Sequence, residues 1–301
     1  MVQRHWEIEV TGPEPVAVAP TDGRLVTKLE FESGLQGRHF ASGAATFILP
    51  TLAEAAKFEA LARSVGLQTW TREVVKYSPA ELMTAPLLVL EVSRAPKGLG
   101  GPASGTIFDF STGCPRCGTG ATQVSPLRLR PSDVKKASKT KIMETLSAEI
   151  LVDEGVSHVL QQAQVSGLEL REAVSPGGDP LGWYQLIPHK ELPPFASDSQ
   201  GILVENSCES CHQDGFFNSA TEPPEIMYRG IDISNQAEVA RTWEHFGNSR
   251  LVEPIEQSRL ARPLILIKPR VARLFESAGV RGVNFIPVQV VGHQSGQTDL
   301  A

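Results

Sequence analysis

The sequence predicts a mixed α/β protein in two parts, an N-terminal α/β unit and a larger unit tied together by four cysteines. Three observations lead to this fold class. Segments near the N-terminus alternate apolar and polar residues, as half-buried strands do. A strand–helix–strand pattern occurs twice in the second half of the chain. Two C-x-x-C pairs, GCPRCG at 113–118 and SCESCH at 207–212, lie far apart in the sequence.

Composition and charge narrow the class of protein. The chain has 301 residues, of which 41% are hydrophobic and 21% charged, so it can bury a core. Its formal net charge of −6 argues against a nucleic-acid partner, because such proteins usually carry a basic footprint. The opening residues, MVQRHWEIEV, have no apolar run of signal-peptide length, and no stretch reaches the roughly 18 apolar residues that span a membrane. We therefore expect a cytoplasmic protein with no membrane partner.

Residues 1–105 are expected to form the N-terminal unit. Thr51 and Glu54 form a T-x-x-E capping box, which predicts a helix from position 52 that ends at Gly66. Alternating or short apolar runs predict strands at 5–10, 26–33, 45–50, 67–75 and 86–92. The turn-rich segment APKGLGGPASG, residues 95–105, is the predicted linker to a second domain at 106–301.

An internal repeat organises the second domain. Residues 150–172 and 265–287 align without a gap at a constant shift of 115 positions, so that Ile150 corresponds to Ile265 and Gly167 to Gly282. Each copy predicts a strand, an amphipathic helix and a second strand. Each copy also follows a C-x-x-C pair. The sequence therefore predicts two duplicated modules, although two amphipathic β-α-β units can also look alike by chance.

The cysteines are the strongest chemical signal. In a compartment where disulfides are rare, two C-x-x-C pairs favour a metal site. A closed structural zinc site takes four ligands, so we expect one zinc-ribbon-like site with a structural Zn²⁺ on Cys114, Cys117, Cys208 and Cys211. Closing the loop between the pairs costs roughly 4 kcal/mol. Structural zinc in small fingers contributes roughly 10–16 kcal/mol, so binding outweighs the loop cost.

Three other interpretations of the cysteines stay open at this point. C-x-x-C-H at 208–212 also spells a covalent haem attachment site, but haem would leave Cys114 and Cys117 without a role. A redox-active C-x-x-C usually begins a helix, and neither pair precedes a convincing amphipathic one. His212 can also serve as a metal ligand in place of a cysteine, although its position directly beside Cys211 makes the geometry awkward.

No catalytic set is evident, so we do not expect an enzyme. The sequence has no H-E-x-x-H helix, no G-x-S-x-G elbow and no phosphate-binding G-x-x-x-x-G-K-[ST] loop. One basic stretch, RLRPSDVKKASKTK at 128–141, suits nucleic acid. It has no interleaved aromatic residues for base stacking, which favours a solvated connector.

The paired cysteine motifs and the segments that follow them resemble a known bacterial family. The chain is similar to the double-CxxCG motif proteins over roughly residues 106–291, through CPRCG, CESCH, ILVDEGVSHVLQQAQVSGLEL, EIMYRGIDIS and LILIKPRVARLFESAGVRGVNFIPV. Members of that family are immunity proteins of contact-dependent toxin systems. The resemblance implies a cytoplasmic protein that binds and neutralises a cognate protein toxin. A zinc-ribbon adaptor that binds nucleic acid or the transcription machinery is the alternative.

Two features depart from the family pattern. His212 stands where the family has glycine, and about 110 residues precede the first motif. The four cysteines match the family position by position. No toxin-contacting residue carries over, because such surfaces diverge with their partners.

Overall fold

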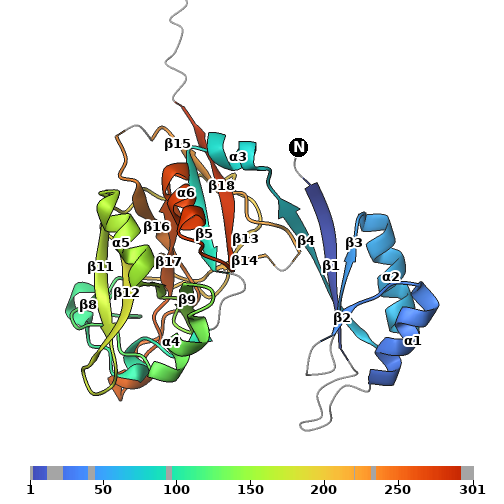
Figure 1. Cartoon of the computed structure of the whole chain (residues 1–301), viewed down its shortest axis with the longest axis horizontal. Coiled ribbons are helices and arrows are strands. Elements are labelled where there is room, and N and C mark those ends of the chain that lie inside the picture. Colours follow the sequence, from blue (N-terminus) through green and yellow to red (C-terminus); the bar gives the residue numbers. More distant parts are fainter. Residues whose placement is uncertain are drawn as a thin grey trace, which may run out of the picture. The chain divides into compact units, whose positions relative to one another are not determined.

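The computed structural model in Figure 1 describes residues 3–11, 23–39, 45–92, 97–219, 221–231 and 235–292. The chain forms two compact units, Met1–Ser78 with Asn218–Pro224, and Pro79–Phe217 with Glu225–Ala301. The first division falls at 78/79, earlier than the boundary predicted at 105/106. The physical reason is that β5 (Leu87–Val92) is a central strand of a sheet in the second unit.

The predicted linker is also part of the second unit. Positions 95 and 96 lie outside the described residues, but β6 (Lys97–Gly98) pairs with β9 (Ile142–Thr145). Gly100 packs so tightly that a Cβ there would lie 2.5 Å from a carboxylate oxygen of Glu149. A segment rich in glycine and proline therefore serves here as a close-packed edge of a sheet.

The first unit is an antiparallel sheet with two helices, and its strands run in the order β2-β3-β1-β4. Its elements are β1 (Gln3–Thr11), α1 (Gly23–Ser33), β2 (Arg38–His39), β3 (Ala45–Leu49), α2 (Leu52–Ser64) and β4 (Gln68–Lys76). The predicted capping box is confirmed, because the Glu54 N–H donates to Thr51 Oγ1 over 3.2 Å. The strand predicted at 26–33 is wrong: this segment is α1, and Val26 and Leu29, three residues apart, are both buried.

The second unit contains two five-stranded sheets. The first sheet has the strand order β11-β12-β10-β9-β6, and the second has β15-β18-β5-β17-β16. The remaining strands of these sheets are β10 (Ile150–Asp153), β11 (Leu168–Val174), β12 (Pro180–Pro188), β15 (Met227–Arg229), β16 (Val239–Phe246), β17 (Arg262–Ile267) and β18 (Val283–Val291). Smaller elements of this unit are α3 (Pro79–Thr84), β7 (Phe108–Asp109), β8 (Thr122–Gln123), α4 (Pro131–Ala137), β13 (Ile202–Val204) and β14 (Phe216–Asn218).

The two predicted strand–helix–strand segments are present. Helix α5 (Glu154–Gln162) joins β10 to β11, and α6 (Pro269–Ser277) joins β17 to β18. The helices begin and end at positions that differ by 115, and the turns that follow them agree as well. Gln164 and Gly279 have φ of 51° and 75°, and Gly167 and Gly282 have φ of 81° and 78°. The same backbone path therefore leads from helix to strand in both segments.

The pairing of strands also agrees between the sheets. β12 lies between β10 and β11 and is antiparallel to both, while β5 lies between β17 and β18 in the same way. In the first sheet, Gln185 pairs with Leu151 and Arg171. In the second, Val89 pairs with the residues 115 positions further on, Leu266 and Ile286. β5 thus has the place in the second sheet that β12 has in the first.

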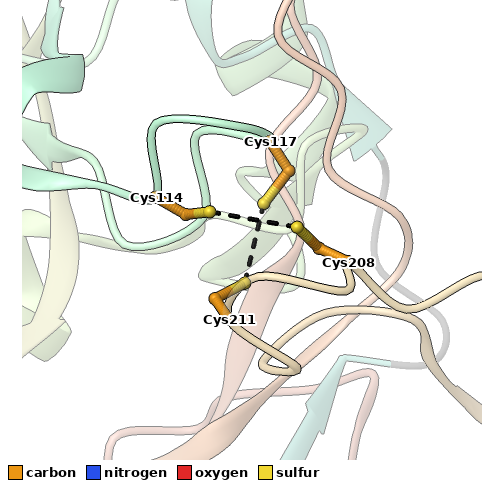
Figure 2. Close-up of side chains that lie close together, drawn as sticks. All are labelled: Cys114, Cys117, Cys208 and Cys211. Carbon is orange, nitrogen blue, oxygen red and sulfur yellow. Dashed lines mark hydrogen bonds between the residues drawn. The ribbon is translucent and has the colours of Figure 1, made fainter.

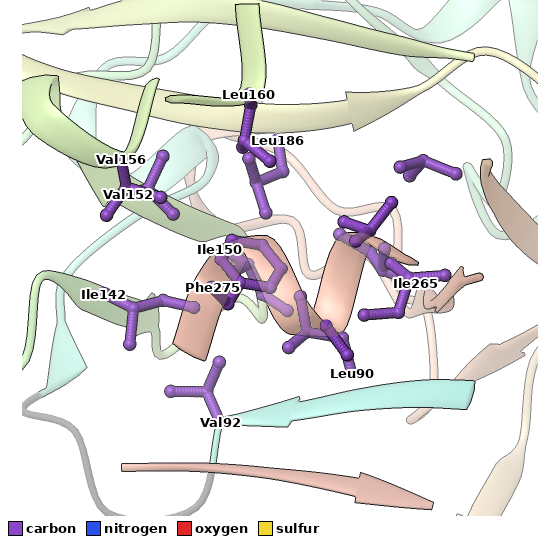
Figure 3. Packing of buried hydrophobic residues seen from close by; sticks show 14 of the residues in the cluster. Leu90, Val92, Ile142, Ile150, Val152, Val156, Leu160, Leu186, Ile265 and Phe275 are labelled. Carbon is purple, nitrogen blue, oxygen red and sulfur yellow. The ribbon is translucent and has the colours of Figure 1, made fainter. Parts of the chain in front are cut away.

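One hydrophobic core joins both sheets. α5 and α6 contact each other, and their buried residues Val156, Leu160, Val271 and Phe275 pack with Leu90 and other residues of both sheets (Figure 3). Separate clusters cover the two outer faces. α4 packs Val134 and Ala137 on the first sheet, and a cluster around Tyr228 covers the second. Within the described segments, no helix has the length and apolar content to cross a bilayer.

Candidate metal centre

The first cysteine pair lies in a tight turn. The Gly118 N–H donates to the carbonyl of Cys114 over 2.8 Å, and the Cys114 N–H donates to the carbonyl of Thr119 over 2.8 Å. Gly118 has φ of 83°, a left-handed conformation that glycine adopts without steric cost. A Cβ at Gly118 would also come within 3.2 Å of the Phe110 ring. The turn therefore favours glycine directly after the second cysteine, both for conformation and for space.

The second pair adopts the same turn with a different residue at this position. The His212 N–H donates to the carbonyl of Cys208 over 2.9 Å, and His212 has φ of 55°. A non-glycine residue in this region is disfavoured by roughly 1–2 kcal/mol. His212 is exposed, so its side chain does not add a packing conflict. The second turn thus accommodates a histidine at the position where the first turn has glycine.

The four sulfurs converge on one point between the turns, as Figure 2 shows. Cys114 Sγ lies 3.9 Å from Cys208 Sγ, Cys117 Sγ lies 3.7 Å from Cys211 Sγ, and all four lie within 4.8 Å of one another. A disulfide would require about 2.05 Å. An ion bonded tetrahedrally to four sulfurs at about 2.3 Å separates them by roughly 3.8 Å. The spacing therefore fits a tetrahedral metal ion and excludes disulfides in this arrangement.

Burial and hydrogen bonding shift the pKa values of cysteine thiols in different directions. Cys117 and Cys208 are buried, and Cys114 and Cys211 are partly buried. Burial raises the pKa of Cys117 to about 12 and also raises the pKa of Cys211. Burial acts against the thiolate of Cys208 too, but N–H groups of Ser210 and Cys211 and the neighbouring thiols lower its pKa to about 7. A cation at the centre of the cluster favours the thiolate form of all four.

A buried polar network supports the site. Asp214, 1% exposed, accepts the Cys208 N–H at Oδ1 over 2.8 Å and the Ser249 N–H at Oδ2 over 2.9 Å. Thr119 Oγ1 lies 3.1 Å from Cys117 Sγ and donates to Ser249 Oγ over 2.7 Å. Sequence reasoning missed these three residues. The only available signal was that Thr119 and Asp214 follow their cysteine pairs closely.

The turns also meet at their surface. Arg116, inside the first C-x-x-C, and Glu209, inside the second, form an exposed ion pair with 2.7 Å between Nη1 and Oε2. Exposed pairs of this kind contribute little to stability because water and salt screen them. The sulfurs and the buried network therefore carry the connection between the turns.

The structure brings together all four cysteines that the sequence singles out, over 94 positions in each cross-turn pair. His212 is not among the ligand atoms of the cluster in the described part of the chain. Neither C-x-x-C pair begins a helix, because Cys117 is followed by a loop into β8 and Cys211 by a loop into β14. The convergence favours one shared ion over haem attachment or a redox pair.

Comparison with known proteins gives no match for this chain, either among models of protein families or among curated proteins. The fold and the site define its class: a mixed α+β protein with four cysteines positioned to bind a metal ion.

Proposed function

We propose that the four cysteines hold one structural Zn²⁺ and that the protein is a zinc-stabilised immunity protein, which binds and neutralises a cognate protein toxin in the bacterial cytoplasm. The observation that carries the metal assignment is the sulfur spacing of 3.7 and 3.9 Å between the turns. Zinc with four thiolates is the common closed, structural form, whereas a catalytic zinc usually keeps one position for water. Four protein ligands thus favour a structural ion, and the proposal is a binding protein and not an enzyme.

The agreement between the two strand–helix–strand segments supports the proposal. The shared strand register and the shared φ values after α5 and α6 are what a duplicated module would retain. We infer that the second unit arose by duplication, with β5 supplying to the second module the strand that β12 supplies to the first. The paired cysteine motifs, which carry the family resemblance, precede the two copies in the same order.

The toxin assignment rests on the family resemblance over residues 106–291, and a growth assay tests it. The first step is to search the reading frames beside the gene for this chain for a toxin-like product, which is then the partner to be tested. The toxin is expressed in a reporter cell alone, with this protein, or with its Cys114→Ser variant. Rescue of growth and a stoichiometric complex with the unaltered chain are expected. Continued toxicity, with no complex between the purified proteins, would rule this partner out.

A zinc-stabilised adaptor that binds nucleic acid is the second candidate, and one observation favours it. The basic stretch 128–141 includes α4, where Lys135 and Lys136 are exposed. Its end contacts the C-terminal end of α6: Lys141 Nζ donates to the carbonyl of Ala278 over 2.7 Å, and the Arg281 N–H to the carbonyl of Thr140 over 3.0 Å. These contacts place the backbone of Arg281 beside the end of the basic segment.

A salt titration distinguishes the two candidates. Binding of duplex and single-stranded oligonucleotides is measured between about 50 and 200 mM salt. A steep loss of affinity with salt, reduced in a Lys135→Gln/Lys136→Gln variant, favours the adaptor. No binding at low salt leaves the toxin partner as the proposal.

A further inference from the structure

A pocket in the second unit has the chemistry of an anion site. It has a volume of about 380 Å³ and is lined by residues of both sheets and of the loop after the first cysteine turn. Its charged side chains are Arg171 from β11, Arg241 from β16, Arg262 from β17, Glu149 and Glu169. Each of the three guanidinium groups is paired with one carboxylate: Arg171 with Glu169, Arg262 with Glu149, and Arg241 with Glu191, which lies outside the lining. An anion with paired oxygens is the ligand that can accept the remaining N–H donors of the three arginines.

Two of the arginines are held in place by carboxylates. Arg262 Nη2 donates to Glu149 Oε1 over 2.7 Å, and its guanidinium carbon lies 4.9 Å from the centre of the Phe108 ring. Arg171 donates from Nε to Glu169 Oε1 over 2.8 Å and from Nη1 to the carbonyl of Gln123 over 3.1 Å. A guanidinium has five N–H donors, so Arg171 and Arg262 each keep further N–H groups that can donate to a ligand. These partners fix the direction of the free donors.

Arg241 is the least satisfied member of the group. Its Nη2 lies 3.1 Å from Glu191, which does not line the pocket. Its Nε is buried and has no hydrogen-bond partner in the described part of the chain. A buried N–H without an acceptor is unfavourable, so the position of this guanidinium is not fixed by hydrogen bonds at Nε. Arg241 and Arg262 both line the pocket, from the paired strands β16 and β17.

Two glutamines of the lining are hydrogen-bonded to each other. Gln185, 6% exposed, exchanges two hydrogen bonds with Gln123, of 2.9 and 3.0 Å between amide nitrogen and oxygen. Both amides therefore already have partners, so the pocket offers its free donors mainly through the arginines. Arginine forks match the paired oxygens of carboxylate and phosphate groups.

We propose that this pocket binds a small anion with a phosphate or carboxylate group, held by Arg171, Arg241 and Arg262. The site is separate from the metal centre and does not depend on the proposed toxin partner. Its ligand is a small molecule that ties strands of the two sheets together. Binding of the ligand stabilises the folded second unit by mass action.

Calorimetric titration of the zinc-loaded full chain tests this proposal with two probes, inorganic phosphate and malonate, at constant ionic strength. Arg241→Gln removes a donor that takes no part in the core or the metal centre. Arg171→Gln is the second variant, and Arg273→Gln, exposed on α6, is the matched control. Saturable binding of at least one probe is expected, weakened about tenfold or more by Arg241→Gln and by Arg171→Gln and unchanged by Arg273→Gln.

The two probes separate the possible sources of the anion. Tighter binding of phosphate indicates a phosphorylated metabolite, and tighter binding of malonate a carboxylic acid. Absence of saturable binding for both probes would overturn the proposal. Equal affinity in the unaltered chain and in both pocket variants would overturn it as well.

Discussion

The two cysteine turns have the same backbone but different support. In both, the N–H four residues after the first cysteine donates to that cysteine's carbonyl, at Gly118 and at His212. The first turn satisfies the Cys114 N–H with the carbonyl of Thr119, whereas the second satisfies the Cys208 N–H with the carboxylate of Asp214. The comparison teaches that the positions of the sulfurs are constrained more strongly than the residues that surround them.

The two five-stranded sheets offer a second comparison, because equivalent strands in them come from different places in the chain. β12 and β5 occupy equivalent places with equivalent register, yet β12 comes after its sheet's helix in the chain and β5 comes long before its own. Packing of a middle strand depends on its partners in space and not on its order in the chain. The predictions below test how far the equivalence of the two turns extends.

Loss of either turn's sulfur has the largest expected effect. In the proposed site both turns hold one ion, so Cys114→Ser and Cys208→Ser should lose metal to the same extent. Loss of a structural metal is among the few changes that cost about 4 kcal/mol or more. Metal analysis and denaturant unfolding of the two variants measure this, with Ser210→Ala as the control in the same turn. Full metal content in one variant alone would mean that the turns do not share an ion.

Asp214→Ala should have the next largest effect, and it tests the buried network that supports the second turn. The change leaves the buried N–H groups of Cys208 and Ser249 without their acceptor, at about 1–3 kcal/mol for each unsatisfied group. Zinc affinity should fall by about 10–100-fold, as for other residues that position metal ligands. A chelator competition assay and urea unfolding measure both quantities. Unchanged zinc affinity and stability would show that the network around Asp214 does not support the site.

Exchanging the residue after the second cysteine should shift stability by about 1 kcal/mol in opposite directions in the two turns. Gly118→Ala should destabilise the fold because it places a Cβ at positive φ beside the Phe110 ring. His212→Gly should stabilise the fold because it removes the strain at φ of 55°. The measurement is the urea midpoint of the metal-loaded proteins. A stabilising Gly118→Ala, or a destabilising His212→Gly, would break the equivalence of the turns.

Arg116→Ala and Glu209→Ala should have the smallest effect. Both side chains are exposed, so their ion pair is screened by water and salt. Melting temperature and metal content should stay within experimental error of the unaltered chain. A clear loss of metal in either variant would give the surface contact a role that its exposure argues against.

The sequence predicted correctly several structural features that depend on residues close together in the chain. The capping box at Thr51 and the helical spacing of α5 and α6 are local, and the four cysteines carry their chemistry in their spacing. Segment 26–33 was predicted as a strand because Leu29 and Phe31 alternate with polar residues. In the structure the segment is a helix, because Val26 and Leu29 lie on one helical face and are buried in the core of the first unit.

The pairing of strands that lie far apart in the chain could not be predicted from local sequence patterns. β5 belongs to the second unit because it pairs with β17 and β18, which lie far along the chain, and nothing in residues 87–92 names those partners. Asp214 and Ser249 were missed for the same reason, because their role appears only when the two turns meet. Residues 95–105 have the composition of a linker, but the contact between Gly100 and Glu149, which lie far apart in the sequence, shows that the described part of this segment is packed.

X-ray absorption spectroscopy at the zinc edge, with metal analysis of the purified chain, tests the central claim most directly. The account predicts one zinc per chain with four sulfur neighbours at about 2.3 Å. A shell that contains nitrogen or oxygen ligands, or a chain with no stoichiometric metal and with cysteines joined as disulfides, would contradict it.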